Sequence, residues 1–223
     1  MKEFDCRKLK QGFDMKEIEK LLDDFYQEQK IREHNRYFSW EYCYSFFKEN
    51  GKNIVKQENL LDLACLNLAV YLASWGMYRG SSKLLQMDYK VHKCTIKELI
   101  SECDCLWGND FDWQDIEKAK NILERNYKKY GVSCTPTLIT KILMGMFGCT
   151  PAYDRFFISG LSVWNNTNKI PKTFNKDSFN ALKKLSEGLK PYTLLTKNIP
   201  YPPMKLIDTY FWCVGNKNQE NEE

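Results

Sequence analysis

The stretch of sequence that decides the fold is GVSCTPTLITKILMGMFGCTPAYDRFF, residues 131–157. Its first residue, Gly131, predicts the end of a helix, because glycine readily adopts the left-handed conformation that follows a last helical turn. Thr135 followed by Pro136 predicts the start of the next helix, with threonine as the N-cap and proline in the first turn. The stretch therefore predicts a tight connection between two helices.

Apolar residues recur at helical spacing on both sides of this connection. The first helix is predicted over residues 114–130, with Asp112 or Asp115 as its N-cap. The second is predicted over residues 136–147. Together they predict a helix, a hairpin and a helix over residues 114–147.

The rest of the chain also reads as helical, because no stretch alternates between apolar and polar residues as a half-buried strand does. Further helices are predicted over residues 14–33, 38–49, 58–76, 83–87, 95–103, 177–189 and 203–213, with Asp14 as the N-cap of the first. The predicted fold class is all-α. We expect one compact helical unit over residues 1–215 and a disordered polar tail at 216–223.

The composition is that of a globular domain. Of 223 residues, 43% are hydrophobic, including 13 Phe, 13 Tyr and 6 Trp, which is enough for a sizeable core. The charged N-terminus lacks the apolar segment of a signal peptide, and the longest apolar stretch, 61–77, is too polar to span a bilayer. We expect a soluble, cytoplasmic protein with no membrane partner. The net charge of +4 lies entirely within residues 61–223, which permits a nucleic-acid partner.

The cysteines and histidines give no catalytic or metal-binding pattern. Nine cysteines are odd in number and follow no disulfide framework, which indicates reduced thiols. Cys103 and Cys105, with Cys94 and His92, fit none of the usual zinc spacings, so we expect no metal and no cofactor. His34 and His92 are isolated, and no role can be assigned to either.

The stretch 131–157 resembles the helix-hairpin-helix DNA glycosylases, the superfamily of endonuclease III and the 8-oxoguanine glycosylases. Gly131 matches the first hairpin glycine, and Ser133 stands where the second would be. Tyr153 and Asp154 stand where the family has a Val-Asp motif with a catalytic aspartate. The resemblance covers residues 114–157. It implies double-stranded DNA as the partner and Asp154 as the catalytic residue.

The resemblance also implies how such a protein would hold DNA. Backbone N–H groups of the hairpin and the positive end of the following helix bind a phosphate without reading sequence. The carboxylate of Asp154 would stabilise an oxocarbenium-like transition state and polarise an attacking water. The residues predicted to bind the DNA backbone are Gly131, Ser133, Thr135, Lys128, Lys129, Lys141 and Arg155.

Two positions depart from the family pattern. Bifunctional members carry a lysine four residues after the first hairpin glycine, where this chain has Thr135, and the next lysine along the chain is Lys141. The resemblance therefore implies a monofunctional enzyme that leaves an abasic site. Ser133 replaces a glycine, and serine tolerates fewer backbone conformations. The iron–sulfur cysteines of some members have no counterpart.

A base pocket is predicted around the end of the 58–76 helix. Trp75 or Tyr78 would stack on a flipped base, and Arg79 would contact a phosphate or a base edge. Asp208 lies within an apolar helical pattern, so it needs a partner, for which Arg79 and Arg155 are the candidates. Tyr153 completes the predicted pocket.

The sequence thus predicts a monomeric, monofunctional DNA glycosylase. Its base could be a damaged host base in DNA repair, or a modified phage base in antiviral defence. A non-catalytic helical DNA-binding or protein-interaction module is the alternative. In the DNA-binding form of this alternative the hairpin still binds the backbone, with an affinity that falls as salt rises. If the resemblance has no functional meaning, Gly131 is an ordinary helix end, and Asp154 is an ordinary cap or an ion-pair partner of Arg155.

Overall fold

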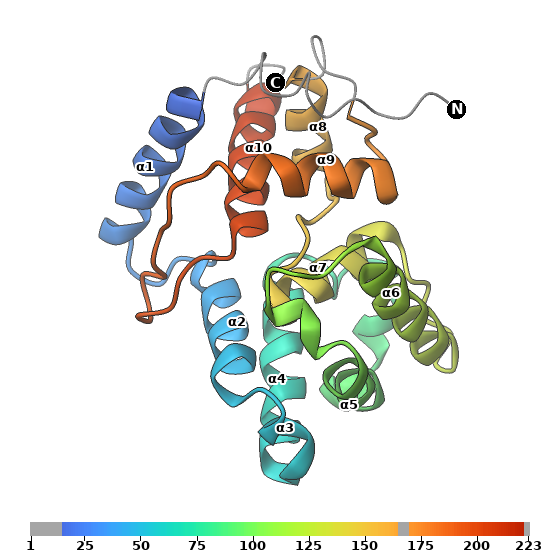
Figure 1. Cartoon of the computed structure of the whole chain (residues 1–223). Helices are drawn as coiled ribbons and strands as arrows, with labels where there is room; N and C mark the ends of the chain where they lie inside the picture. Colours follow the sequence, from blue (N-terminus) through green and yellow to red (C-terminus); the bar gives the residue numbers. More distant parts are fainter. Residues whose placement is uncertain (1–14, 165–169, 221–223) are drawn as a thin grey trace.

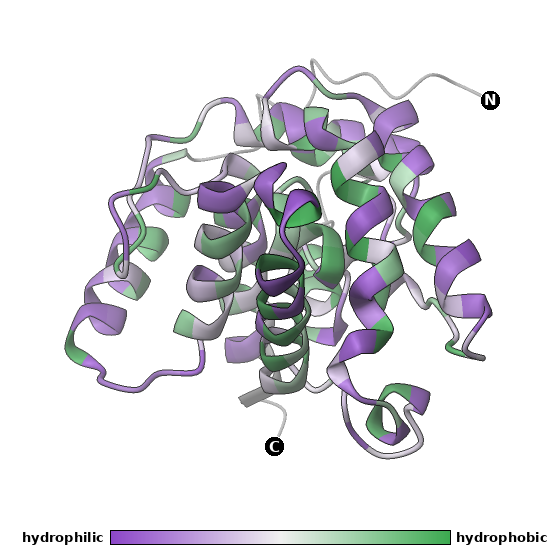
Figure 2. Ribbon diagram, turned by 90° about the horizontal axis from the view of Figure 1, so that it is seen from below, coloured by the Kyte–Doolittle hydropathy of each residue, from purple (hydrophilic) through white to green (hydrophobic). Residues whose placement is uncertain are grey.

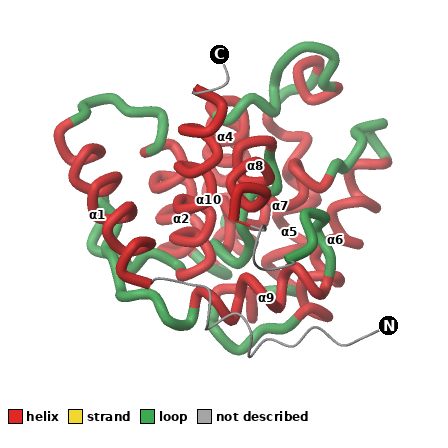
Figure 3. The backbone as a smooth tube through the Cα atoms, turned by 90° about the horizontal axis from the view of Figure 1, so that it is seen from above, coloured by secondary structure: helices red, strands yellow, loops and turns green. Residues whose placement is uncertain are grey.

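The computed structural model describes residues 15–164 and 170–220, and the regular elements in these ranges are all helical (Figure 1). The α-helices are α1 Met15–Ile31, α2 Phe38–Asn50, α3 Asn53–Lys56, α4 Glu58–Ser74, α5 Lys93–Glu102, α6 Trp113–Lys128, α7 Pro136–Phe147, α8 Arg155–Trp164, α9 Lys176–Ser186 and α10 Pro203–Glu220. The 3₁₀ turns are η2 Lys83–Gln86, η3 Tyr89–His92 and η4 Asp104–Trp107. The described residues contain no β-strand, as Figure 3 also shows, which confirms the all-α class.

The helices form two groups that meet around α7 (Figure 1). One group contains α2 to α6, with α2 and α4 packed against each other and against α7. The other contains α1, α8, α9 and α10, in which α8 and α10 make the most extensive contact. Because α1 packs on α10, the first and last described helices lie in the same group.

The core runs through both groups as one continuous cluster of buried side chains. In Figure 2 the hydrophobic colour gathers towards the centre of the molecule, while the outer helices carry polar bands. Every residue of α7 from Leu138 to Phe147 is buried, so this helix lies at the centre of the fold. Burial of this apolar surface is the main source of stability for such a domain.

Helices α8 and α10 approach each other closely enough for backbone contact. A Cβ added at Gly160 would lie 1.9 Å from the carbonyl oxygen of Phe211. A Cβ added at Gly215 would lie 1.9 Å from the carbonyl oxygen of Phe156. Only glycine fits at either position, and the contact therefore fixes how α8 sits along α10.

The connection between α6 and α7, residues 129–135, forms as the sequence predicts. Gly131 adopts φ 68°, its N–H donates to the carbonyl of Lys128, and the N–H of Val132 donates to the carbonyl of Tyr127. These two bonds are the Schellman pattern that satisfies the last carbonyls of a helix. Thr135 caps α7 through a 3.2 Å bond from the N–H of Leu138. Among the described residues, Ser133 is not one of those with positive φ, so its side chain is compatible with this connection.

Several sequence predictions differ from the structure. The 83–87 helix is a short 3₁₀ turn, and α8 was not predicted as a helix. The predicted disordered tail is wrong for residues 216–220, because α10 continues to Glu220. The predicted N-cap Asp14 and residues 221–223 lie outside the described residues.

Two further predictions concern caps and membranes. Asp112, not Asp115, is the N-cap of α6, and Asp115 completes a capping box with it. None of the helices in the described ranges combines the length and the hydropathy that crossing a bilayer requires.

Candidate functional site

A narrow cleft opens where the two groups of helices meet. The enclosed space between its walls measures about 30 Å³, which is room for about two water molecules. With the open mouth included, the empty space is about 580 Å³. Its walls carry aromatic rings, Glu41 and two Lys–Asp pairs. The wall residues include Tyr37, Trp40, Trp75, Lys141, Asp154, Lys205, Asp208 and Trp212.

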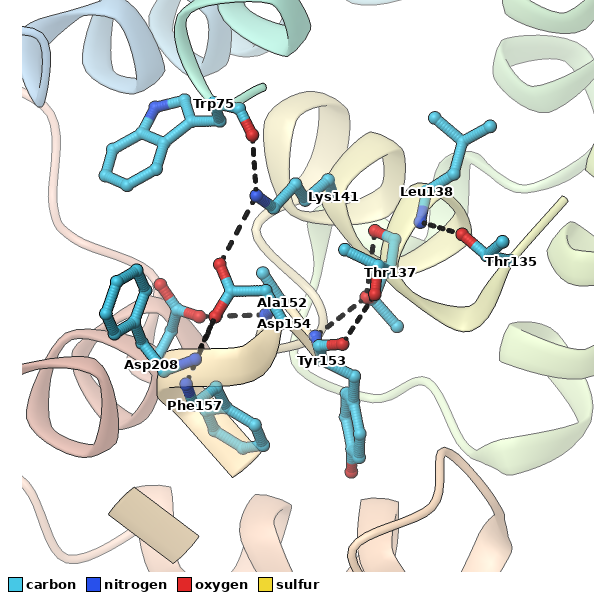
Figure 4. A network of polar contacts seen from close by, with 12 residues as sticks. Trp75, Thr135, Thr137, Leu138, Lys141, Ala152, Tyr153, Asp154, Phe157 and Asp208 are labelled. Carbon is cyan, nitrogen blue, oxygen red and sulfur yellow. Dashed lines mark hydrogen bonds and ion pairs between the residues drawn. The ribbon is translucent and has the colours of Figure 1, made fainter. Parts of the chain in front are cut away.

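Asp154 reaches the cleft as the N-cap of α8. Its Oδ1 accepts hydrogen bonds of 3.1 Å from the backbone N–H groups of Phe156 and Phe157. Its Oδ2 faces the ammonium of Lys141 at 3.3 Å (Figure 4). The carboxylate thus sits at the positive end of a helix, where negative charge is favoured.

Lys141 is the buried partner of this carboxylate. It projects from the middle of α7 and donates a 3.0 Å hydrogen bond to the carbonyl of Trp75 (Figure 4). Burial lowers the pKa of Lys141, and the nearby carboxylate of Asp154 opposes that shift. Its ammonium also lies 5.7 Å from the centre of the Trp75 ring.

The segment that leads to Asp154 is held by short polar side chains of α7. The hydroxyl of Thr137 donates to the carbonyl of Tyr153 at 2.8 Å, and the hydroxyl oxygen of Thr140 accepts the N–H of Tyr153 at 2.9 Å (Figure 4). From the other side, Oδ1 of Asp208 accepts the N–H of Ala152 at 2.8 Å. Asp154 is therefore positioned by α7, α8 and α10 together.

Lys205 and Asp208, one turn apart on α10, form the second pair. The Lys205 ammonium lies 2.7 Å from Oδ2 of Asp208. It also lies 5.1 Å from the centre of the Trp40 ring and 5.9 Å from that of Trp75. Burial raises the pKa of Asp208, and Lys205 opposes that shift.

A buried carboxylate of α2 anchors the segment that closes one side of the cleft. This segment, residues 187–202, is called the strap. Glu41 accepts backbone hydrogen bonds from Leu195 at 3.1 Å and Thr196 at 2.8 Å, and side-chain bonds from Thr196 and Tyr201. Because Leu195 and Tyr201 line the cleft, Glu41 fixes its wall.

The residues predicted to bind DNA backbone fall into two sets. Gly131, Ser133, Thr135, Lys128, Lys129 and Arg155 are exposed. Among the described residues, the backbone N–H groups of Ser133 and Cys134 find no acceptor, so they remain free to bind a phosphate. The prediction that Lys141 binds the DNA backbone is wrong, because its ammonium is buried against Asp154 and is not exposed beside the connection.

The predicted base pocket is only partly assembled. Trp75 and Asp208 line the cleft, but Asp208 pairs with Lys205, not with Arg79 or Arg155 as predicted. Tyr78 instead bonds to the buried His92 at 2.7 Å. Arg79 is exposed and its guanidinium packs near Gly76. Tyr153 is buried, and its hydroxyl contacts Ser178.

Sequence reasoning missed several site residues, among them Tyr37, Trp40, Glu41, Lys205 and Trp212. Lys205 carried a usable signal, since it lies three residues before Asp208 and such pairs face each other on a helix. Glu41 gave no signal, because its partners lie more than 150 residues away along the chain.

The described residues contain no group of three or more His, Cys, Asp or Glu side chains placed to hold a metal ion. The eight cysteines in the described ranges are all free thiols. His92 is buried, with its two ring nitrogens facing the hydroxyls of Tyr78 and Tyr127. His34 lies in an exposed turn at φ 56°.

Comparison with known proteins gives no relative. No protein-family model matches the chain, and no similar protein was found among the curated proteins or the solved structures.

Proposed function

We propose that the chain is a monofunctional DNA glycosylase that flips a damaged or modified base into the cleft and hydrolyses its bond to the sugar. The observation that carries the proposal is the position of Asp154. It caps a helix at an aromatic cleft, after an α6–connection–α7 unit whose exposed N–H groups suit a phosphate. A flipped base needs an aromatic surface on which to stack, and Trp75 offers one.

In the proposed reaction the bond between C1′ and the base breaks, and its electron pair leaves with the base. The oxocarbenium character that develops on the sugar is stabilised by the carboxylate of Asp154. Water adds to C1′, and one of its protons passes through Asp154 to the departing base, so that a neutral base and an abasic site result. Thr135 offers no amine, and the amine of Lys141 is engaged with Asp154 and the carbonyl of Trp75.

Base entry requires two changes in this site. The enclosed 30 Å³ is far too small for a nucleobase, so the walls have to separate. The ammonium of Lys141 also cancels much of the field of Asp154, so their 3.3 Å pair has to loosen before the carboxylate can stabilise a cation. Glycosylases of this kind act on DNA that they deform, and binding energy from the backbone can supply the opening.

The experiment is base excision on labelled duplexes that contain 8-oxoguanine, uracil, alkylated purines, or hydroxymethylated or glucosylated cytosine, each followed by alkali. We expect wild-type protein to give alkali-dependent cleavage of at least one duplex and Asp154→Asn to lose it by about 100-fold or more. Full activity in Asp154→Asn contradicts the assignment. Strand cleavage without alkali, or a borohydride-trapped adduct on an abasic duplex that Lys141→Met abolishes, contradicts the monofunctional mechanism.

The small enclosed volume favours a second candidate, a helical module that binds DNA without catalysis. The exposed connection and Lys128 and Lys129 would still bind backbone, with an affinity that falls steeply as salt rises. Salt-sensitive binding to every duplex, with all bases intact after long incubation, selects this candidate.

A further inference from the structure

The hydrogen-bonding groups left over in the cleft are donors. Lys205 has three N–H donors, and among the described residues its one hydrogen-bond acceptor is Asp208. Only 10% of its side chain is exposed, so the remaining donors face the aromatic walls of the cleft. The indole N–H of Trp212, another wall residue, is buried and has no acceptor in the described part of the chain. Buried donors without acceptors are costly, so a ligand that brings acceptors is favoured here.

Each oxygen of Asp154 and Asp208 already has at least one partner in the cleft. Asp154 accepts two backbone N–H groups and faces Lys141. Asp208 accepts the N–H of Ala152 and the ammonium of Lys205. A ligand that presents donors therefore competes with bonds that already exist, whereas a ligand that presents acceptors does not.

Positive charge also gathers around the ring on which a base would stack. In the described residues three cations lie within 6 Å of the Trp75 ring centre: Arg36 at 5.2 Å, Lys141 at 5.7 Å and Lys205 at 5.9 Å. An indole attracts cations through its face, but here that attraction is already used. Lys141 and Lys205 are each paired with an aspartate, so a further cation on Trp75 finds its counter-charges in use and a ring that three cations already share.

We propose that the cleft selects a neutral base whose inward edge carries carbonyl or ring-nitrogen acceptors, that it rejects positively charged N-alkylated bases, and that Lys205 reads the acceptor edge. This inference rests on the proposed function and names its substrate class. Oxidised purines and uracil-type bases fall inside the class, and 7-methylguanine, which is cationic in DNA, falls outside it.

The test measures binding, so that it does not depend on catalysis. Duplexes carry 2′-fluoro-arabino nucleotides of 8-oxoguanine, uracil or 7-methylguanine, because the fluorine prevents loss of the base. We expect wild-type protein to bind at least one neutral-base duplex about tenfold more tightly than the 7-methylguanine duplex, the effect of one charge-assisted hydrogen bond. Lys205→Met should lose this preference, and Lys52→Met, which removes an exposed lysine of the α2–α3 turn, should keep it.

Lys205→Met leaves Asp208 without its partner, so the double variant Lys205→Met/Asp208→Asn is measured as well and should also lose the preference. Lys205→Arg keeps the charge and should retain it. Equal or tighter binding of the 7-methylguanine duplex overturns the inference. A preference for neutral bases that survives in both Lys205→Met and Lys205→Met/Asp208→Asn also overturns it. Identical binding of all duplexes, including an unmodified one, does so too. Selective binding without excision of any base would overturn the glycosylase and leave the charge selectivity standing.

Discussion

Two lysines in the described part of the chain are buried, and each faces an aspartate. Bringing an ammonium and a carboxylate out of water costs several kcal/mol per ion, so such pairs are a weak source of stability. Lys141 and Asp154 approach to 3.3 Å across two different helices, α7 and α8. Under the proposed function, the fold accepts this cost because the carboxylate of Asp154 acts at the cleft.

His92 illustrates a buried ionisable residue with a structural role. It is enclosed by Tyr78 and Tyr127, and burial lowers the pKa of its imidazole to about 3. In the unfolded chain a histidine takes up its proton near pH 6.5. Between about pH 6.5 and pH 3, His92 is therefore protonated in the unfolded chain and neutral in the folded protein, so unfolding takes up a proton.

Stability should consequently fall as the pH drops below about 6.5, by about 1.4 kcal/mol per pH unit from this residue alone. Urea unfolding measured between pH 7 and pH 4.5 checks this. The slope should be smaller by about that amount in His92→Gln and unchanged in His34→Gln, which alters an exposed turn. An identical slope in wild type and His92→Gln would contradict the assignment.

Among the elements, α7 follows from its sequence and α8 does not. The glycine, threonine and proline signals around residues 131–136 place the start of α7 correctly, because they act within a few residues of each other. Helix α8, Arg155–Trp164, has aromatic residues and a central glycine with poor helix propensity. It is helical because Gly160 packs on the backbone of α10, which no local pattern could reveal.

The glycine contact makes a sharp prediction for α8. Gly160→Ala places a methyl group 1.9 Å from the carbonyl oxygen of Phe211, so α8 has to shift or detach. We expect a loss of about 3 kcal/mol or more in the free energy of unfolding, as for other overpacked sites. Val163→Ala, on the exposed side of the same helix, should change it by less than about 1 kcal/mol. Thermal and urea unfolding measure both variants. If Gly160→Ala and Val163→Ala lowered the free energy of unfolding by the same amount, α8 and α10 would not meet as described.

The site residues, like the helices, include some that the sequence predicts and some that it does not. Asp154 could be singled out from its sequence context, and the structure places it at the cleft. Its pairing with Lys141 depends on how α7 and α8 cross. The sequence prediction paired Asp208 with Arg79 or Arg155, whereas its partner is Lys205, one turn away on the same helix. Glu41 was not predictable at all, because its partners are supplied by the strap.

At the scale of the whole molecule, Glu41 ties the N-terminal helices to the strap that precedes α10. Glu41→Ala removes the acceptor of four hydrogen bonds and leaves buried donors unpaired, at about 1–3 kcal/mol for each group that stays buried. We expect the strap to open first, so limited proteolysis should cut within residues 187–202 several-fold faster than in wild type.

The strap offers its own control. Glu49 contacts the same segment through an exposed pair with Lys197, at 3.3 Å, and exposed pairs contribute little. Glu49→Ala should therefore leave the cleavage rate unchanged. If both variants were cleaved at the same rate, the buried anchor would have no special part in holding the strap.

The walls of the cleft come from distant parts of the chain: α1, α2 and the end of α4, then α7 and the segment before α8, and finally the strap and α10. During synthesis these parts appear in order, and the first of them cannot form a cleft until the last has been made. A chain that ends between Phe147 and Trp212 contains the α6–connection–α7 unit but no finished cleft. Under the proposed function, such an unfinished chain could still hold DNA but could not remove a base from it.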